Sequence, residues 1–80
     1  MDIIFTDYSE ESISDRNISK EVIKDALLNP EEIVKAKKEN RMIAHKMVGD
    51  KLLRVVFEAN KKAYIVVTAY YTHPERYMKK

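Results

Sequence analysis

The stretch MIAHKMVGDKLLRVVFE, residues 42–58, constrains the fold of this chain more than any other segment. Its β-branched and aromatic content on both sides of one Gly-Asp pair predicts two strands joined by a two-residue turn. Gly49 is the sole glycine of the 80 residues, and glycine accepts the positive φ that such a turn requires. With the turn at Gly49 and Asp50, His45 is predicted to lie directly opposite Arg54.

The same alternation predicts a further strand at residues 64–71. Aligning its apolar residues with those of the preceding strand sets Arg54 beside Thr68, with Tyr70 next along. One face of the sheet is therefore predicted to carry His45, Arg54 and Thr68 in a row across three strands. The opposite face is more apolar, and we expect the helices to cover it.

Two helices are predicted between a first strand at Ile3–Thr6 and the rest of the sheet. In the first helix, Asp7 is followed three residues later by Glu10, which is the pattern of an N-cap with its return contact. The second helix begins after Ser19 as N-cap and carries its apolar residues on one stripe. It stops at Asn29, because a proline follows.

The remaining chain predicts four strands. The first of them, within residues 31–38, is expected at an edge of the sheet, because its lysines discourage further pairing. Residues 72–80 form either a short helix or a tail. The predicted order is β-α-α-β-β-β-β, a single α+β domain over residues 1–80 with two N-terminal helices on one face of an antiparallel sheet.

Charge is divided unevenly along the chain. Residues 1–34 hold nine acidic and three basic side chains, a net charge of −6, whereas residues 35–80 hold four acidic and twelve basic ones, a net charge of +8. A basic half is typical of proteins that bind an anionic partner such as RNA or an acidic protein. The alternative is that the lysines only keep a small domain in solution.

Several kinds of site are not expected. The chain has no cysteine and two histidines, His45 and His73, so no metal site is predicted. It has no glycine-rich phosphate loop, and no cofactor is predicted. The apolar runs are far shorter than the roughly 18 residues that span a bilayer, and the acidic start lacks the basic region of a signal peptide. We therefore expect a cytoplasmic protein with no membrane association.

Three short motifs carry a resemblance to a known family. They are TDY at residues 6–8, RNIS at residues 16–19, and Arg54 together with Thr68 and Tyr70 in the last two strands. With them the chain resembles the domain-of-unknown-function family 4258 over roughly residues 3–77. That family is in turn similar to the RelE/ParE group of small toxins, which implies two N-terminal helices against an antiparallel sheet.

Two positions depart from the family pattern. Tyr8 stands where the family has a histidine, which puts any catalytic role of that position in doubt. Asn17 stands where the family has a glycine, and asparagine tolerates the left-handed backbone conformation that glycine favours.

The RelE likeness implies a metal-independent endoribonuclease that acts on mRNA, on the ribosome in many cases, and that pairs with an antitoxin protein. This chemistry needs positive donors on the phosphate and groups that move protons. Arg54 suits the phosphate, His45 suits proton transfer near neutral pH, and Tyr70 suits donation to the substrate. The residues expected to bind the substrate are Arg16, Tyr8, Thr68, Tyr71, Arg76 and Tyr77.

Each of these residues also has a structural interpretation. Arg54 could pair with Asp15 or Glu58, His45 could be a half-exposed histidine of the sheet, and the tyrosines could only pack. Two other functions remain open for the same reason. One is a non-enzymatic module that binds RNA or protein, which the loss of the motif histidine favours. The other is a ParE-like inhibitor of a protein target.

Overall fold

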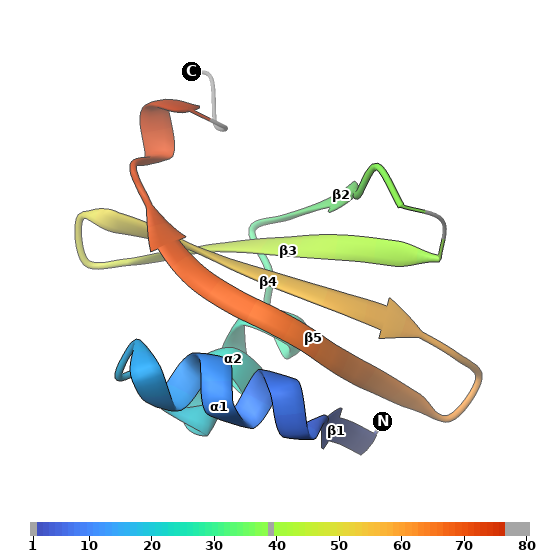
Figure 1. Cartoon of the computed structure of the whole chain (residues 1–80). Coiled ribbons are helices and arrows are strands. Elements are labelled where there is room, and N and C mark those ends of the chain that lie inside the picture. Colours follow the sequence, from blue (N-terminus) through green and yellow to red (C-terminus); the bar gives the residue numbers. More distant parts are fainter. Residues whose placement is uncertain (1, 39, 77–80) are drawn as a thin grey trace.

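A computed structural model of the chain describes residues 2–38 and 40–76 (Figure 1). These residues form one five-stranded sheet in the order β1-β5-β4-β3-β2. In chain order the elements are β1 (Asp2–Phe5), α1 (Asp7–Asp15), α2 (Lys20–Leu28), β2 (Glu32–Lys35), β3 (Arg41–Val48), β4 (Lys51–Ala59), β5 (Ala63–Thr72) and the 3-10 turn η1 (Pro74–Arg76).

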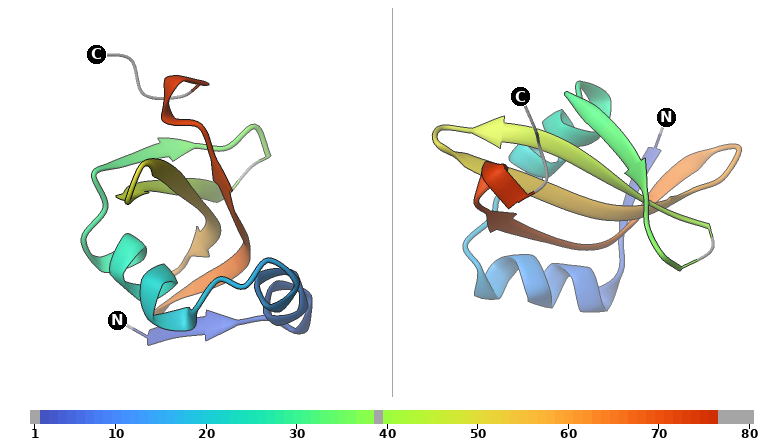
Figure 2. Two further views of the ribbon diagram at one scale, coloured as in Figure 1. Left: turned by 90° about the vertical axis from the view of Figure 1, so that its left-hand side faces the viewer. Right: turned by 90° about the horizontal axis from the view of Figure 1, so that it is seen from above.

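The predicted α+β class and the order of its elements are confirmed. Both helices lie on the same side of the sheet, and η1 lies on the other side (Figure 2). The sheet is mixed rather than antiparallel throughout, because β1 runs parallel to β5 and pairs with its first residues, Ala63–Val66. β2 is an edge strand, as predicted, and is shorter than expected.

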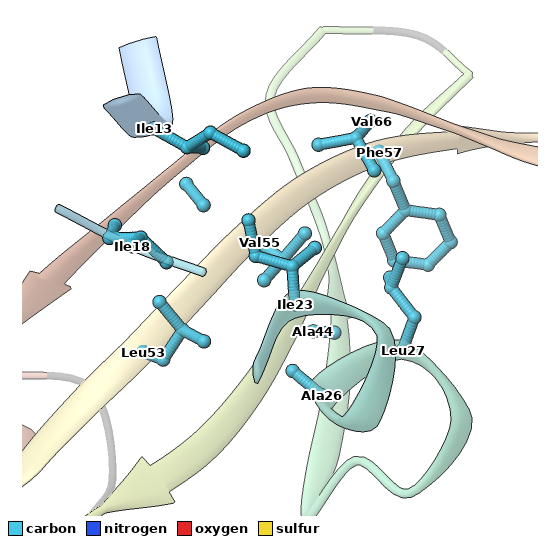
Figure 3. Packing of buried hydrophobic residues seen from close by; sticks show 11 residues of the cluster. Ile13, Ile18, Ile23, Ala26, Leu27, Ala44, Leu53, Val55, Phe57 and Val66 are labelled. Atoms are coloured by element: carbon cyan, nitrogen blue, oxygen red, sulfur yellow. The ribbon is translucent and has the colours of Figure 1, made fainter. Parts of the chain in front are cut away.

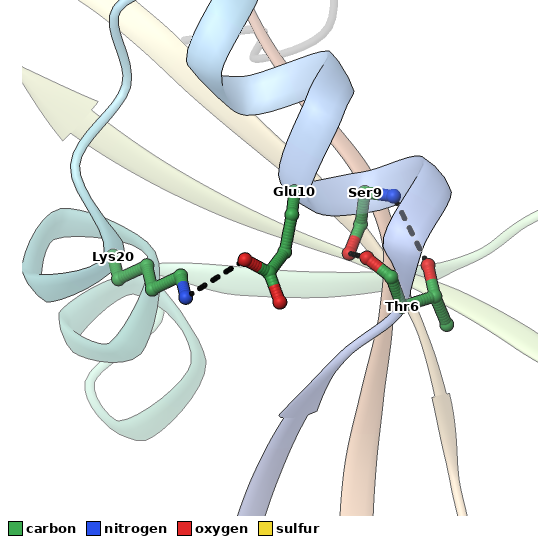
Figure 4. Close-up of polar contacts among 4 residues, drawn as sticks. All are labelled: Thr6, Ser9, Glu10 and Lys20. Carbon is green, nitrogen blue, oxygen red and sulfur yellow. Dashed lines mark hydrogen bonds and ion pairs between the residues drawn. The ribbon is translucent and has the colours of Figure 1, made fainter.

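Helix α1 is capped by Thr6, one residue earlier than predicted (Figure 4). Thr6 Oγ1 accepts a hydrogen bond from the Ser9 N–H at 3.0 Å, and Ser9 Oγ donates to the Thr6 carbonyl at 2.9 Å. Asp7 instead lies in the first turn, where its charge favours the helix dipole. Glu10 makes no return contact to the cap; its carboxylate pairs with Lys20 Nζ at 3.2 Å and so connects α1 to α2.

The junction between α1 and α2 is set by Asn17 and Ser19, two residues that the sequence analysis singled out. Asn17 has a φ of 57°, the left-handed conformation expected for the family's glycine position. The Ile18 N–H then bonds the Ile13 carbonyl at 2.9 Å, and both isoleucines enter the core. Ser19 is the N-cap of α2, as predicted, since its side chain accepts from the Val22 N–H at 3.2 Å.

The apolar core lies between the helices and one face of the sheet, called here the helix face (Figure 3). Alternate residues of β4 supply its centre, because successive side chains of a strand point to opposite sides. The helix face consists of Ala44, Leu53, Val55, Phe57 and Ala69, and the helices contribute Ile13, Ile23, Ala26 and Leu27.

The β3–β4 hairpin has the predicted register. Gly49 has a φ of +65°, and His45 is paired with Arg54. A positive φ at the first turn residue matches the twist of the two strands. The short turn therefore leaves one alignment, which places His45 and Arg54 side by side on the face away from the helices. This open face includes the polar residues His45, Arg54, Glu58, Thr68 and Tyr70 and the apolar residues Ile43, Leu52 and Val56.

The predicted register between β4 and β5 is wrong. Arg54 is paired with Tyr70 rather than with Thr68, and Thr68 is paired with Val56. The pairs are displaced by an even number of residues here, so Arg54 and Tyr70 still share a face.

Two shifts of one residue each explain the error. Next to the turn, Ala59 is paired with Tyr64, one residue beyond the predicted alignment, and a β-bulge adds the second shift. The partner of Val56 is Thr68, but the partner of the next residue, Phe57, is Val66. Val67 is therefore an extra residue in β5. Beyond the bulge the alternation reverses, so that Val66 enters the core while Ile65 lines the open face. A strict two-residue period contains no signal for such an insertion.

Candidate functional site

Four side chains form a continuous hydrogen-bonded row across β2, β3, β4 and β5. His45 Nδ1 lies 3.2 Å from Glu32 Oε1, Arg54 Nε lies 3.1 Å from His45 Nε2, and Arg54 Nη1 lies 2.6 Å from Tyr70 Oη. Adjacent strands hold the members in place, since Glu32 is paired with His45, and Arg54 with both His45 and Tyr70. We call these four residues the polar row.

The direction of each hydrogen bond in the polar row follows from Arg54. A guanidinium has donors and no acceptor, so His45 Nε2 must accept the bond from Arg54 Nε. A neutral imidazole then carries its proton on Nδ1 and donates it to the Glu32 carboxylate. His45 thus connects a negative group on β2 to a positive group on β4.

The polar row is buried at its centre and open at its two ends. His45 is 2% exposed and Arg54 is 9% exposed, whereas the Glu32 side chain is 48% exposed and Tyr70 is half-buried. Within the described part of the chain, no buried side-chain nitrogen or oxygen is left without a hydrogen-bond partner. The row is therefore a satisfied network whose ends meet solvent.

Tyr70 is the member best placed to meet a ligand. Its hydroxyl accepts from Arg54 Nη1, so its own proton can be donated outward. The guanidinium carbon lies 5.6 Å from the centre of the Tyr70 ring. The guanidinium therefore holds the Tyr70 side chain both by a hydrogen bond and by contact with its ring.

Thr68 joins a second polar group. Its Oγ1 lies 2.8 Å from Ser12 Oγ on α1, and Ser12 Oγ also accepts from Arg16 Nη1. The Arg16 guanidinium in addition bonds the Ser12 carbonyl at 3.2 Å. Thr68 and Arg16, which the sequence analysis selected separately, are thus linked through Ser12.

The other predicted residues are placed differently. Tyr8 is 68% exposed at the start of α1. Tyr71 lies on the helix side of β5 and packs against the core, which separates it from the adjacent Tyr70. Arg76 is the last residue of η1, and the position of its side chain lies outside what the structure describes. Tyr77 lies outside the described residues.

Two members of these groups escaped sequence reasoning. Glu32 lies in the predicted edge strand and Ser12 in the first predicted helix, but neither residue was selected for the site. Glu58, one of the carboxylates considered for Arg54, bonds Arg41 Nε at 3.1 Å. Only the docking of β2 and α1 onto the sheet brings Glu32 and Ser12 to the predicted residues, so no local pattern marks them.

A groove of about 710 Å³ lies on the open face beside the polar row. The bulge helps to shape it, because the consecutive residues Val67 and Thr68 both line it. The first turn of α1 forms one wall. The lining residues are Thr6, Tyr8, Arg41, Val56, Glu58, Ile65, Val67 and Thr68.

Other types of site receive no support from the described residues. No three of their His, Cys, Asp and Glu side chains gather where they could hold a metal ion. None of the described helices has the length and apolar character needed to cross a membrane.

Comparison with known proteins gives one match. Neither the curated proteins nor the solved structures that were searched contain a match to this chain. The family model described as a domain of unknown function (DUF4258) matches residues 5–71, which include both helices, strands β2 to β4 and all four members of the polar row. The chain therefore belongs to the DUF4258 family.

Proposed function

We propose that this protein is a metal-independent endoribonuclease that cuts mRNA on the open face of its sheet. The observation that carries the proposal is the polar row, which buries a guanidinium and directs it at the hydroxyl of the half-exposed Tyr70. An acid held beside a fixed positive charge is what phosphodiester cleavage without a metal requires.

The proposed reaction uses the RNA's own 2′-hydroxyl as nucleophile. Its oxygen attacks the adjacent phosphorus and its proton passes to solvent water. The bond to the 5′ oxygen breaks, and Tyr70 donates its proton to that leaving oxygen. The products are a 2′,3′-cyclic phosphate and a 5′-hydroxyl end, so no bond is oxidised or reduced. Arg54 orients the Tyr70 hydroxyl and attracts the phosphate. Solvent water returns a proton to Tyr70 after the products leave.

In this mechanism His45 is a positioning residue rather than an acid or base. Both of its ring nitrogens are engaged, with Glu32 and with Arg54, and the ring is almost fully buried. It orients the guanidinium, much as a buried carboxylate orients a catalytic imidazole. Arg16, at the end of α1, is linked to Thr68 of the open face through Ser12, and in this proposal it supplies a second cation for the RNA backbone.

The test is mRNA cleavage in a cell-free translation mixture. Tyr70→Phe should lower the cleavage rate by about 100-fold or more, while Tyr71→Phe removes the neighbouring hydroxyl on the helix side and should leave the rate within about twofold. Arg54→Ala should also abolish cleavage, with circular dichroism confirming that the variant is folded. Intact mRNA with the wild-type protein would sink the nuclease proposal.

A non-enzymatic RNA-binding module is the second candidate, and the burial of Arg54 and His45 favours it. A guanidinium that is 9% exposed reaches a phosphate less readily than an exposed one does. Tyr8 in place of the family histidine favours the same candidate. Intact mRNA in the cleavage assay, together with binding of the same RNA measured by fluorescence anisotropy, would support this function over the nuclease.

We further propose an acidic antitoxin as the protein partner. The net charge of +8 on residues 35–80 attracts an acidic segment, and such a segment laid on the open face would exclude RNA. The ribosome is the proposed site of action, since ribosomal RNA offers the same anionic backbone.

A further inference from the structure

We propose that the groove beside the polar row is a subsite for an unpaired guanine base of the RNA. This inference rests on the proposed function, because it names the part of the substrate that the site recognises. It concerns a different set of residues, however, and its test does not depend on cleavage.

The position of the groove suits a base whose phosphate lies at Tyr70. Val56 and Thr68 are paired with each other two residues along from Arg54 and Tyr70, on the same face. Two residues of a strand span roughly 7 Å. A nucleotide with its phosphate at the end of the polar row can therefore place its base in the groove.

The lining of the groove suits an aromatic ring. Val56, Ile65 and Val67 form an apolar floor, and Tyr8 stands at the wall with 68% of its surface exposed. An exposed tyrosine beside an apolar floor is a stacking platform for a base.

The polar end of the groove selects among the bases. Arg41 and Glu58 lie side by side there, joined by one bond at 3.1 Å from Arg41 Nε to Glu58 Oε2. The Glu58 side chain is 40% exposed, so its carboxylate can accept further hydrogen bonds. Arg41 keeps its two terminal amino groups as donors beside that carboxylate.

Guanine is the RNA base whose Watson–Crick edge complements this pair. It presents one acceptor, O6, next to two donors, N1–H and N2–H. Arg41 can donate to O6 while Glu58 accepts from both N–H groups in a two-pronged, charge-assisted contact. Adenine, cytosine and uracil each offer a carboxylate only one donor on that edge, so the geometry favours guanine.

The test uses RNA that cannot be cut. Two fluorescein-labelled 2′-O-methyl pentaribonucleotides, AAGAA and AAAAA, lack the nucleophilic hydroxyl, and their dissociation constants are measured by fluorescence anisotropy. We expect the wild type to bind AAGAA about tenfold more tightly than AAAAA. The methyl signals of Val56, Ile65 and Val67 should shift with AAGAA, and those of Val55 on the helix face should not.

Variants separate recognition from general attraction. Glu58→Gln should reduce the preference for guanine to less than about threefold, because an amide cannot accept both bonds. Tyr8→Ala should weaken both RNAs by about tenfold through lost stacking. Glu21→Gln on α2 removes an equal charge outside the groove and should keep the preference. The ratio of the two constants cancels any change in electrostatic attraction.

The outcomes of this experiment and of the cleavage assay are independent. Equal binding of the two RNAs by the wild type, or a preference that survives Glu58→Gln, would overturn the guanine subsite even if mRNA is cut. A preference that Glu58→Gln removes, in a protein that cuts nothing, would support the subsite and reject the nuclease.

Discussion

Both faces of strand β4 contain buried residues, yet the two faces are stabilised in different ways. On the helix face, Leu53, Val55 and Phe57 pack against the helices without polar contacts of their side chains. On the open face, Arg54 is buried through directed bonds to His45 and Tyr70. Apolar burial is non-directional, whereas a buried polar network is stable only when each member has its partner. The helix face therefore supplies most of the apolar stabilisation, and the open face adds a defined arrangement of charge to its own buried apolar residues such as Leu52.

The largest effect is expected on the helix face. Phe57→Ala removes a side chain that is 2% exposed at the centre of the core and should lower the free energy of unfolding by about 3–5 kcal/mol. Urea denaturation followed by circular dichroism measures the loss. Val56→Ala, the adjacent residue on the open face, should cost about 1 kcal/mol or less. Similar losses for the two variants would contradict the division between the faces.

A somewhat smaller effect is expected from the polar row. Arg54→Leu fills the space but leaves His45 Nε2 and the Tyr70 hydroxyl without their donor. The free energy of unfolding should fall by about 2–3 kcal/mol. Arg41→Leu breaks a more exposed pair with Glu58 and should cost under about 1 kcal/mol. An Arg54→Leu protein as stable as the wild type would show that the polar row does not contribute to the free energy of unfolding.

The tautomer of the His45 ring tests the direction of the hydrogen bonds in the polar row, with Arg41→Leu as the control. In ¹⁵N–¹H spectra of the histidine rings, we expect His45 of the wild type to carry its proton on Nδ1, because Nε2 accepts from Arg54. Arg41→Leu should leave that tautomer unchanged. A wild-type proton on Nε2 would contradict the order of donors in the row.

A substitution in the turn that aligns β3 with β4 should have an intermediate effect on the free energy of unfolding. Gly49 has a φ of +65°, and a Cβ added there meets no atom within 4 Å. The cost of Gly49→Val is therefore backbone strain alone, about 1–2 kcal/mol. Gly49→Asn should lower the free energy of unfolding by only about 0.3 kcal/mol, since asparagine tolerates this conformation. Equal melting temperatures for the two variants would mean that the turn does not select the register.

The smallest effect is expected at the surface. Glu10 and Lys20 form an ion pair whose side chains are about half exposed (Figure 4). Glu10→Gln should change the free energy of unfolding by less than about 0.5 kcal/mol, and added salt should reduce the difference further. Comparison with Arg54→Leu then separates an exposed charge contact from a buried one. A loss above 1 kcal/mol would place this pair among the major contacts of the fold.

Much of the fold was predictable because its signals are local. Ser19, Asn17 and Gly49 each set the backbone of a single junction, and the structure has the expected conformation at all three. The contact between His45 and Arg54 was predictable for the same reason, since a two-residue turn leaves one alignment of β3 and β4. The Thr6 cap was missed by one residue, because Asp7 offers the same capping chemistry.

The rest of the site was not predictable, because it depends on contacts between distant segments. The alignment at the β4–β5 turn and the bulge at Val67 together place Tyr70, rather than Thr68, beside Arg54. Glu32 reaches His45 only when β2 pairs with β3, and Ser12 reaches Thr68 only when α1 docks on β5. The groove combines the start of α1 with three strands, so no stretch of sequence contains it.

The sequence by itself determined the class of the fold, the order of its elements and the pairing of His45 with Arg54. Turns, caps and alternating apolar residues act over a few neighbours, and their physical effect can be read without the rest of the chain. The tertiary structure decided which groups complete the polar row and how the open face is shaped. Those outcomes arise from the docking of whole strands and helices, where one inserted residue redirects every side chain that follows.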